Sequence, residues 1–206
     1  TRGTILVPWK FDPNDGMLRQ KSRLLRADCQ HNAENYNIPC LLYAGGFNFC
    51  HNSILELCPY DSLHGLFFGE EISMAVRLYT HGIDLYAPPQ TVCYHLWKRN
   101  SLRAREDNNS KEEKQRQDAL EMVRKQLRGL GRGLGTVRSA EQFSQQLSVD
   151  FEKQILVSGC ENAGLNEDAF VSLPTFNDAA GVAAGSSCSG DIDMSSVLTL
   201  VSQFMK

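Results

Sequence analysis

The sequence lacks a hydrophobic run anywhere near the roughly 20 residues that a membrane-spanning helix needs. It also lacks the basic, apolar and small-residue order of a secretory signal peptide, and its first residue is Thr1 rather than Met. We therefore expect no membrane span in this chain. We also expect the chain to be a fragment or a processed piece of a longer protein.

Cysteine pairs with metal-binding or redox spacing are absent as well. The chain has seven cysteines, an odd number, and no two of them stand in a CxxC arrangement. This pattern argues against a disulfide framework or a zinc site, so we expect free thiols in a reducing compartment, the cytoplasm. One glycosylation sequon, Asn108-Asn109-Ser110, keeps the Golgi lumen open as the alternative location.

The chain has no overall excess of positive charge. Its net charge is −3, and the Arg/Gly-rich segment Gly129–Gly135 has no interleaved aromatic residues on which bases could stack. We therefore expect no nucleic-acid partner. A hydrophobic content of 42% and a charged content of 22% are typical of a globular protein, and 206 residues can bury one sizeable core.

Most of the chemistry-bearing residues gather in the stretch Leu66–Lys98. Gly69 interrupts an apolar run, and Glu70 and Glu71 then place negative charge where the dipole of a helix beginning there favours it. Gly82 supplies the left-handed stop. The apolar residues between them recur with helical spacing: Ile72, Ala75, Val76 and Tyr79. The pattern predicts a helix between the two glycines.

Two short strands are predicted to follow this helix. The first covers Ile83–Tyr86 and is interrupted by Pro88-Pro89, because proline has no N–H for a sheet and restricts the residue before it. The second covers Val92–Trp97, which is rich in β-branched and aromatic residues and carries His95 near its end.

The rest of the chain predicts a strand, three helices and a tail. A strand over Thr4–Trp9 leads into an Asp-Pro-Asn-Asp-Gly turn. The basic residues after it form either a solvated surface or an electropositive rim for an acidic acceptor or a nucleotide diphosphate: Arg19, Lys21, Arg23 and Arg26. Residues 28–38 are expected to form an exposed loop. Helices are predicted over Ser53–Leu57, Lys111–Leu127 and Ser139–Asp150, the last with Ser139 as N-cap, and a smaller helical segment over Ser158–Leu173.

The residues of the central stretch carry a resemblance to a known family. FFGEEISMAVRLYTHGIDLYAPP, followed by YHLW, resembles the signature of the glycosyltransferases that attach N-acetylglucosamine to hydroxyproline on a cytoplasmic ubiquitin-ligase adaptor subunit. The similarity continues through DGMLRQKSR, AGGFNF…PYD and GLGTVRSAEQF…VDFE, and covers most of Asp12–Phe170. More distantly, the run is similar to the second half of the catalytic domain in the GT-A class, which includes the polypeptide N-acetylgalactosaminyltransferases.

This resemblance implies an α/β fold, the C-terminal part of a GT-A (nucleotide-diphospho-sugar transferase) fold with an appended helical segment. Residues 1–105 would form the acceptor-side half of the catalytic domain, and residues 106–173 its helical C-terminal extension. Residues 174–206 are rich in Ala, Gly and Ser, which predicts a flexible tail that ends in a short helix over Met194–Met205.

The implied reaction is the metal-dependent transfer of N-acetylglucosamine from UDP-GlcNAc to a hydroxyproline or another hydroxyl side chain of an acceptor protein. Two alternatives stay open. One is a related GT-A polypeptide glycosyltransferase with another sugar or acceptor. The other is a non-catalytic module that binds a partner protein on the same scaffold. The sequence does not reveal whether the anomeric configuration is retained or inverted; the more distant resemblance to the GT-A class points to retention.

The resemblance also implies the site. Glu70 and Glu71 are the candidate catalytic acids. Neighbouring side chains on a helix point about 100° apart. One of the two would therefore face the sugar or the acceptor, and the other would bond the backbone or an arginine such as Arg77. The glycine pair Gly45-Gly46 would border the donor sugar, because paired glycines allow close approach and expose amide donors.

Three further residues complete the predicted site. His95 is the candidate metal ligand, and an imidazole among oxygen ligands favours manganese; the alternative is a histidine packed between its aromatic neighbours. Asp61 would shape its turn or contact the acceptor. Trp97 would stack on the sugar or uracil, or else belong to the core.

The sequence departs from the GT-A class at one important point. These enzymes bind the metal mainly through an acidic DxD-type motif, and no such motif stands upstream of Gly45, where the pattern of Asp12–Asp15 is that of a turn. We therefore expect the nucleotide-binding half of the catalytic domain to be absent from this chain, and we expect the chain to be inactive alone.

Overall fold

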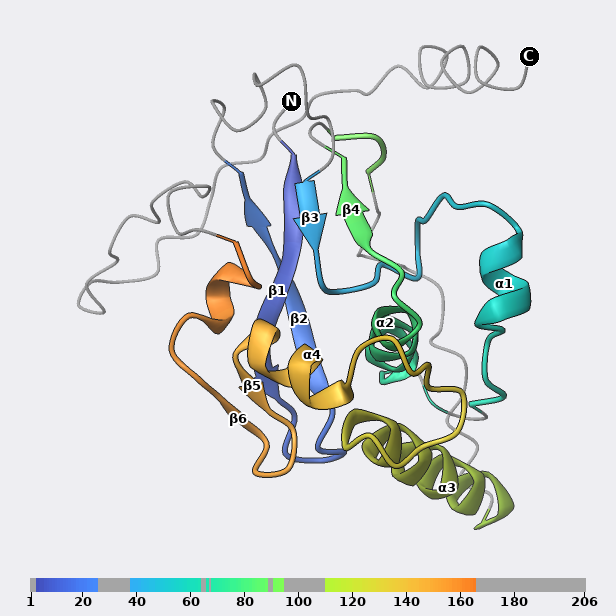
Figure 1. The fold of residues 1–206 in the computed structure, drawn as a ribbon. Coiled ribbons are helices and arrows are strands. Elements are labelled where there is room, and N and C mark those ends of the chain that lie inside the picture. Colours follow the sequence, from blue (N-terminus) through green and yellow to red (C-terminus); the bar gives the residue numbers. More distant parts are fainter. Residues whose placement is uncertain are drawn as a thin grey trace, which may run out of the picture. The chain divides into compact units, whose positions relative to one another are not determined.

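The computed structural model describes residues 3–25, 38–63, 66, 68–88, 91–94 and 110–165. The chain divides into two compact units, Thr1–Ser172 and Leu173–Lys206, and all described residues belong to the first unit (Figure 1). The predicted tail, residues 174–206 with its terminal helix Met194–Met205, lies outside the described residues. Mixed helices and small antiparallel sheets confirm the α/β prediction at that level.

The first two strands form an antiparallel hairpin, β1 (Thr4–Phe11) with β2 (Leu18–Leu24). The predicted strand over Thr4–Trp9 is confirmed and runs two residues further. The predicted turn is confirmed too: the Gly16 N–H donates to the Asp12 carbonyl at 2.7 Å, and Gly16 has a φ of +67°. β2 was not expected, because its sequence, LRQKSRL, is mostly polar and only the hairpin gives it a partner strand.

A second pair joins distant segments, β3 (Ile38–Cys40) with β4 (Leu85–Ala87). Ile38 is therefore a buried strand residue and not the end of an exposed loop; residues 28–37 lie outside the described residues. The strand predicted over Ile83–Tyr86 begins at Leu85 because Ile83 still belongs to the helix end, where its N–H donates to the Leu78 carbonyl at 3.0 Å.

The strand predicted over Val92–Trp97 is wrong in its described part. Residues 92–94 adopt no strand, and the side chains of Val92 and Tyr94 are 55% and 80% exposed. No strand in the described segments pairs with these residues. Their β-type composition therefore has no neighbouring strand with which to form backbone hydrogen bonds. His95 and Trp97 lie outside the described residues.

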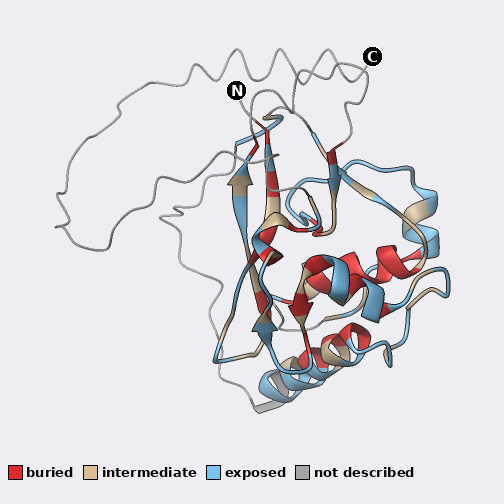
Figure 2. Ribbon diagram, turned by 60° about the vertical axis from the view of Figure 1, so that its left-hand side comes forward, coloured by how far each residue is buried: buried red, intermediate tan, exposed pale blue. Residues whose placement is uncertain are grey.

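The central helix α2 (Glu70–Thr80) is confirmed between its two glycines. Gly82 has a φ of +81°, and its N–H donates to the Tyr79 carbonyl at 3.0 Å, which completes the Schellman end. The helix is buried on all sides from Ile72 to Thr80, not only on the predicted apolar face (Figure 2). This burial follows from the packing of α3 (Ser110–Leu127) and α4 (Ala140–Leu147) against it.

The later helices are confirmed with changed ends. α3 begins one residue before the prediction. α4 has the predicted N-cap, in a full capping box between Ser139 and Gln142. The helix predicted to reach Asp150 ends at Leu147, because Ser148 takes a left-handed conformation (φ 55°). The next residues form the hairpin of β5 (Val149–Asp150) and β6 (Ile155–Leu156), whose buried Val149 belongs to the core.

Two short elements complete the described chain. The predicted helix α1 (Ser53–Leu57) is confirmed, and none of its residues is buried. Of the helical segment predicted over Ser158–Leu173, the described part contains only a single 3₁₀ turn, η2 (Cys160–Asn162). One hydrophobic core joins the β1–β2 hairpin, α2, α3 and α4, so the two predicted segments 1–105 and 106–173 both contribute to it.

Candidate functional site

Glu71 connects the first turn of α2 to the glycine loop, which we define as residues 44–50. The Gly45 N–H donates to Glu71 Oε1 at 2.8 Å, and the side-chain amide of Gln20 on β2 donates to Glu71 Oε2. Both carboxylate oxygens of Glu71 therefore accept hydrogen bonds inside the protein. This matches the expectation that one of the two acids bonds the backbone.

Glu70 has a different environment. Its Oε2 is buried and has no hydrogen-bond partner among the described residues. Burial raises the pKa of the Glu70 carboxyl, and the neighbouring Glu71 raises it further, whereas the Glu70 backbone N–H and Arg19 oppose the change. Glu70 is therefore the acid of the pair that is free to accept a hydrogen bond or a proton from a bound molecule.

The two glycines of the pair are not equivalent. A Cβ on Gly45 would lie 3.4 Å from both Cγ and Oε1 of Glu71, which is van der Waals contact. A Cβ on Gly46 would meet nothing within 4 Å. Neither glycine has a positive φ, so backbone conformation does not require glycine at either position. Gly46 thus has open space on the side where a Cβ would stand.

A pair of tyrosines ties the glycine loop a second time. The hydroxyls of Tyr43, directly before the loop, and Tyr60, beyond α1, lie 2.5 Å apart. The Asn48 side chain also bonds the Tyr43 hydroxyl. Burial and the Tyr60 contact raise the pKa of Tyr43 well above its usual value. Hydrogen bonds therefore fix the glycine loop at Gly45 and at Asn48, and Tyr60 binds the residue directly before the loop.

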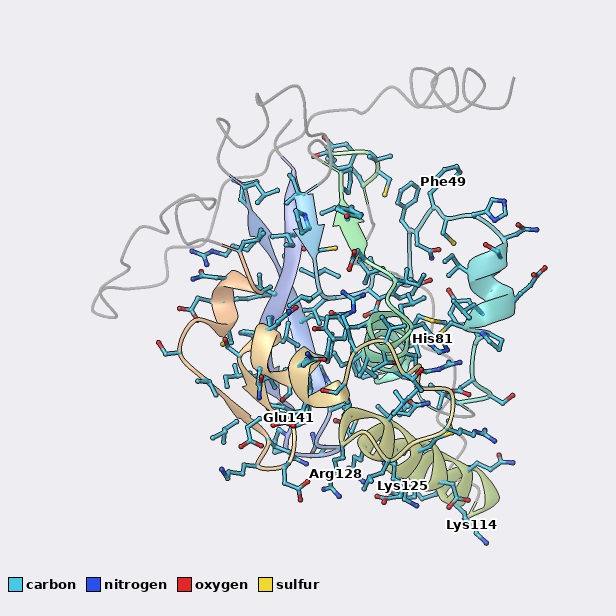
Figure 3. All side chains as sticks on the ribbon, viewed as in Figure 1. Phe49, His81, Lys114, Lys125, Arg128 and Glu141 are labelled. Atoms are coloured by element: carbon cyan, nitrogen blue, oxygen red, sulfur yellow. The ribbon has the colours of Figure 1, made fainter. Side chains whose placement is uncertain are left out.

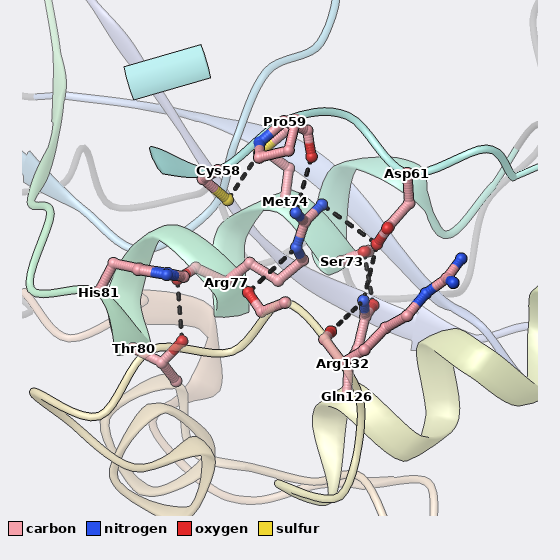
Figure 4. A network of polar contacts seen from close by, with 11 residues as sticks. Cys58, Pro59, Asp61, Ser73, Met74, Arg77, Thr80, His81, Gln126 and Arg132 are labelled. Atoms are coloured by element: carbon pink, nitrogen blue, oxygen red, sulfur yellow. Dashed lines mark hydrogen bonds and ion pairs between the residues drawn. The ribbon is translucent and has the colours of Figure 1, made fainter. Parts of the chain in front are cut away.

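Asp61 lies in a separate polar network with Arg77, Gln126 and Ser73 (Figure 4). Its Oδ2 accepts from Arg77 Nη1 at 3.1 Å and from Gln126 Nε2 at 2.8 Å. The Gln126 Oε1 in turn accepts from the hydroxyl of Ser73 at 2.6 Å. Arg77, only 3% exposed, also donates to the carbonyls of Pro59 and Gly133.

This network gives Asp61 a structural task in the described protein: it joins its turn, α2 and α3. It also changes the expectation for Arg77, which pairs with Asp61 and with none of the carboxylates at the first turn of α2. The structure thus brings Glu71 and Gly45 into contact and places Asp61 in a different cluster.

The predicted metal ligand and stacking residue, His95 and Trp97, lie outside the described residues. Within the ranges that the structure does describe, no group of three or more His, Cys, Asp or Glu side chains could hold a metal ion. These residues therefore do not build a metal site by themselves.

The five described cysteines are free thiols, and burial raises the pKa of Cys40 to about 11.

A hollow of about 430 Å³ lies at the opposite end of α2, where Thr80 faces the segment 134–140. Thr80 and Glu70 are the two ends of the 11-residue helix α2, about 15 Å apart along its axis. None of the candidate site residues lines it. The hollow therefore lies between the end of α2 and the loop after α3. It is not part of the acidic site.

Sequence reasoning missed Gln20 and Tyr43, which hold the site together. Gln20 lies on β2 and Tyr43 lies just beyond β3, where a polar side chain and a tyrosine are ordinary residues. One property of the sequence could have indicated Gln20. In a strand that follows the hairpin turn, side chains point alternately to the two faces, so Gln20 lies on the same face as the buried Leu18.

A family model described as Glycosyltransferase (GlcNAc) matches residues 3–157, more than half of the 206-residue chain. The chain belongs to this glycosyltransferase family. The matched segment contains the β1–β2 hairpin, the glycine loop and all of α2. Neither the curated proteins nor the solved structures that were compared with this glycosyltransferase gave a match. In the part of the chain that the structure describes, no helix is long and apolar enough to cross a membrane.

Proposed function

We propose that this glycosyltransferase chain is the acceptor-side half of a GT-A enzyme that transfers N-acetylglucosamine from UDP-GlcNAc to a hydroxyl side chain of a protein. Hydroxyproline is the acceptor that the sequence resemblance favours. The observation that carries the proposal is the unequal pair of acids. Glu71 is engaged by the glycine loop, and Glu70 beside it keeps a buried oxygen without a donor among the described residues.

The proposed division of labour follows from these contacts. In the transfer, the acceptor oxygen bonds to the anomeric carbon, and UDP departs with the electron pair of the bond that breaks. The proton of the acceptor hydroxyl passes to a carboxylate or to the leaving diphosphate. Glu70 accepts a hydrogen bond from a sugar or acceptor hydroxyl, and because burial raises its pKa it binds a proton more tightly than an exposed glutamate does. Gly46 provides the open approach for the donor sugar.

The metal belongs to the proposal through His95. A divalent cation supplies charge neutralisation at a leaving diphosphate when it is bound. His95 is the candidate ligand in this sequence, and its imidazole favours manganese. The acidic metal motif is missing upstream of Gly45, so we propose that residues outside this sequence supply it and that the 206 residues alone do not turn over a UDP-sugar.

The decisive assay incubates UDP-GlcNAc and Mn²⁺ with acceptor peptides that contain hydroxyproline, serine or threonine. Mass spectrometry detects an added N-acetylhexosamine. We expect the product with the complete gene product and not with the 206 residues alone. Substantial turnover by the 206 residues contradicts the proposed division into halves. Absence of any sugar transfer by the complete protein contradicts the proposed function itself.

His95→Ala tests the metal ligand in the complete protein. We expect loss of Mn²⁺-dependent UDP binding in a calorimetric titration. The matched control is His51→Ala, since His51 lies exposed in the segment before α1 and bonds Ser53. Unchanged binding and turnover in His95→Ala contradict the role of His95.

A non-catalytic partner-binding module is the second candidate, and one observation favours it. The segment from the glycine loop to Tyr60 exposes large apolar side chains, and Phe49 is 98% exposed and points outward (Figure 3). Such side chains are typical of protein-binding surfaces. Binding of a protein partner without binding of UDP or transfer of sugar supports this candidate and contradicts the enzyme.

A further inference from the structure

Gln20 is the residue through which the β1–β2 hairpin contacts the acidic site. Its Nε2 donates to Glu71 Oε2 and lies 3.4 Å from the Tyr43 carbonyl, a second acceptor. Both partners are acceptors, so only the NH₂ side of the amide can face them. A flipped amide would direct its oxygen at a carboxylate. The orientation of Gln20 is therefore fixed by its partners.

These contacts form a closed ring with the glycine loop. Gln20 holds the carbonyl of Tyr43, and Glu71 holds the amide of Gly45 at 2.8 Å. Gln20 and Glu71 in turn hold each other. The chain between Tyr43 and Gly45 is thus fixed at both ends by side chains from β2 and α2, which are 51 residues apart in the sequence.

We infer that Gln20 is a positioning residue of the glycosyltransferase site, and this inference rests on the proposed function. Its amide sets the carboxylate of Glu71 and the beginning of the glycine loop at once, so that Gly46 and Glu70 present a fixed surface to the donor sugar. The remaining oxygen of the amide, Oε1, is buried without a partner among the described residues. It can accept from a bound hydroxyl while both existing contacts stay in place.

A positioning role differs from a merely structural one in what its loss changes. Gln20→Met keeps a similar length and removes the donor. A hydrogen bond to a charged group contributes enough for a change of roughly tenfold or more when it is lost. We expect KM for UDP-GlcNAc to rise by about that factor, with a smaller change in kcat, because the loop that receives the donor is no longer held.

The test uses the complete protein and three variants. Gln20→Met removes the donor, and Gln20→Lys restores N–H donors on a slightly longer chain. Gln117→Met is the matched control, because Gln117 makes a comparable bond to Glu113 on the exposed surface of α3, at 2.7 Å. The measurements are KM, kcat, thermal midpoint and the exchange rate of the Gly45 amide proton by NMR.

We expect Gln20→Met to raise KM and to speed Gly45 exchange by roughly tenfold or more. Gln20→Lys should recover both toward the wild type, and Gln117→Met should change neither. Faster exchange with unchanged KM, or unchanged exchange, overturns the inference. If Gln20→Met fails to fold, a wild-type KM in Gln20→Asn, whose shorter amide cannot reach both acceptors, overturns it instead. If the wild type transfers no sugar, the proposed function fails, and Gly45 exchange still shows whether Gln20 holds the loop.

Discussion

Glu70 and Glu71 are adjacent in the sequence, but only the carboxylate of Glu71 accepts hydrogen bonds on both of its oxygens. Glu71 accepts from Gly45 and Gln20, which offsets the loss of water around its charge. Glu70 is half-buried, and its Oε2 has no donor among the described residues. Burial therefore raises the pKa of Glu70, so the folded protein binds its proton more tightly than the unfolded chain does.

Glu70→Gln tests this difference through its effect on stability at different pH values. Because the folded pKa of Glu70 is raised, the wild type is favoured below the ordinary glutamate pKa of about 4.3 and loses stability as the pH rises above it. Glu70→Gln removes that loss. We expect the variant to gain stability relative to the wild type at neutral pH and not at about pH 3, well below that ordinary pKa, measured by urea unfolding.

Glu71→Gln is the control at the neighbouring position. The new amide keeps one acceptor oxygen and turns its NH₂ group toward the other donor, either the Gly45 N–H or the Gln20 amide, so we expect the variant to lose stability at neutral pH. A loss of stability in both variants contradicts the assignment of Glu70 as the unpartnered acid.

The pair of Asp61 and Arg77 gives a second prediction at this scale. Removal of one partner from a buried ion pair leaves an uncompensated charge, which costs about 3–5 kcal/mol. Arg77 is 3% exposed, so we expect Asp61→Ala to lower the free energy of unfolding by an amount of that order. Asp84→Ala is the control, since Asp84 is 59% exposed in its pair with Arg138 and its loss should cost less than about 1 kcal/mol. Equal losses contradict the structural role of Asp61.

Local backbone hydrogen bonds decide where helices α2 and α3 end, whereas contacts with distant segments decide how they pack. α2 and α3 both end in a Schellman arrangement, with Gly82 and Gly129 in the left-handed conformation. The segment 129–135, directly after α3, is held by tertiary contacts instead. It runs back against α2, and the Gly135 N–H donates to the Thr80 hydroxyl at 2.9 Å. The close approach of two backbones requires glycine there.

Gly135→Ala should reveal this close approach. An added Cβ would lie 2.4 Å from the Thr80 carbonyl oxygen and 2.6 Å from the His81 backbone. Backbone atoms cannot move away without distorting α2, so we expect a loss of about 1–3 kcal/mol, measured by urea unfolding. Gly46→Ala meets nothing within 4 Å and should stay within about 0.5 kcal/mol of the wild type. The reverse order of the two effects contradicts this account.

The first unit of the protein depends on one shared core. α2 is buried on all sides from Ile72 to Thr80 because α3 and α4 cover it. The buried faces of those helices include Leu120, Val123 and Phe143. A segment 1–105 without α3 and α4 would expose these contact surfaces to water, at about 25 cal/mol per Å² of apolar area.

We therefore predict that residues 1–105 do not fold alone, although the sequence pattern separates them from residues 106–173. Residues 1–172 should unfold in one cooperative transition, followed by circular dichroism and by tryptophan fluorescence. Residues 1–105 should show no such transition. A cooperative transition in residues 1–105 contradicts the shared core.

The sequence by itself determined the parts of this protein that depend on neighbouring residues. Gly69 and Gly82 delimit α2, the Asp-Pro-Asn-Asp-Gly turn closes the hairpin, and Ser139 begins α4, because caps and turns are made between residues a few positions apart. The family resemblance also comes from the run around Glu70 and Glu71, and the glycosyltransferase family match confirms it at that level.

Only the tertiary structure decided which acid is engaged. The partners of Glu71 come from β2 and from the glycine loop, far away in the sequence, and the partner of Arg77 is Asp61 and neither acid. The pairing of β3 with β4 and the burial of α2 likewise depend on distant segments. Hydrogen bonds and desolvation act through space, so the one-dimensional pattern that predicts a helix cannot state what surrounds its side chains.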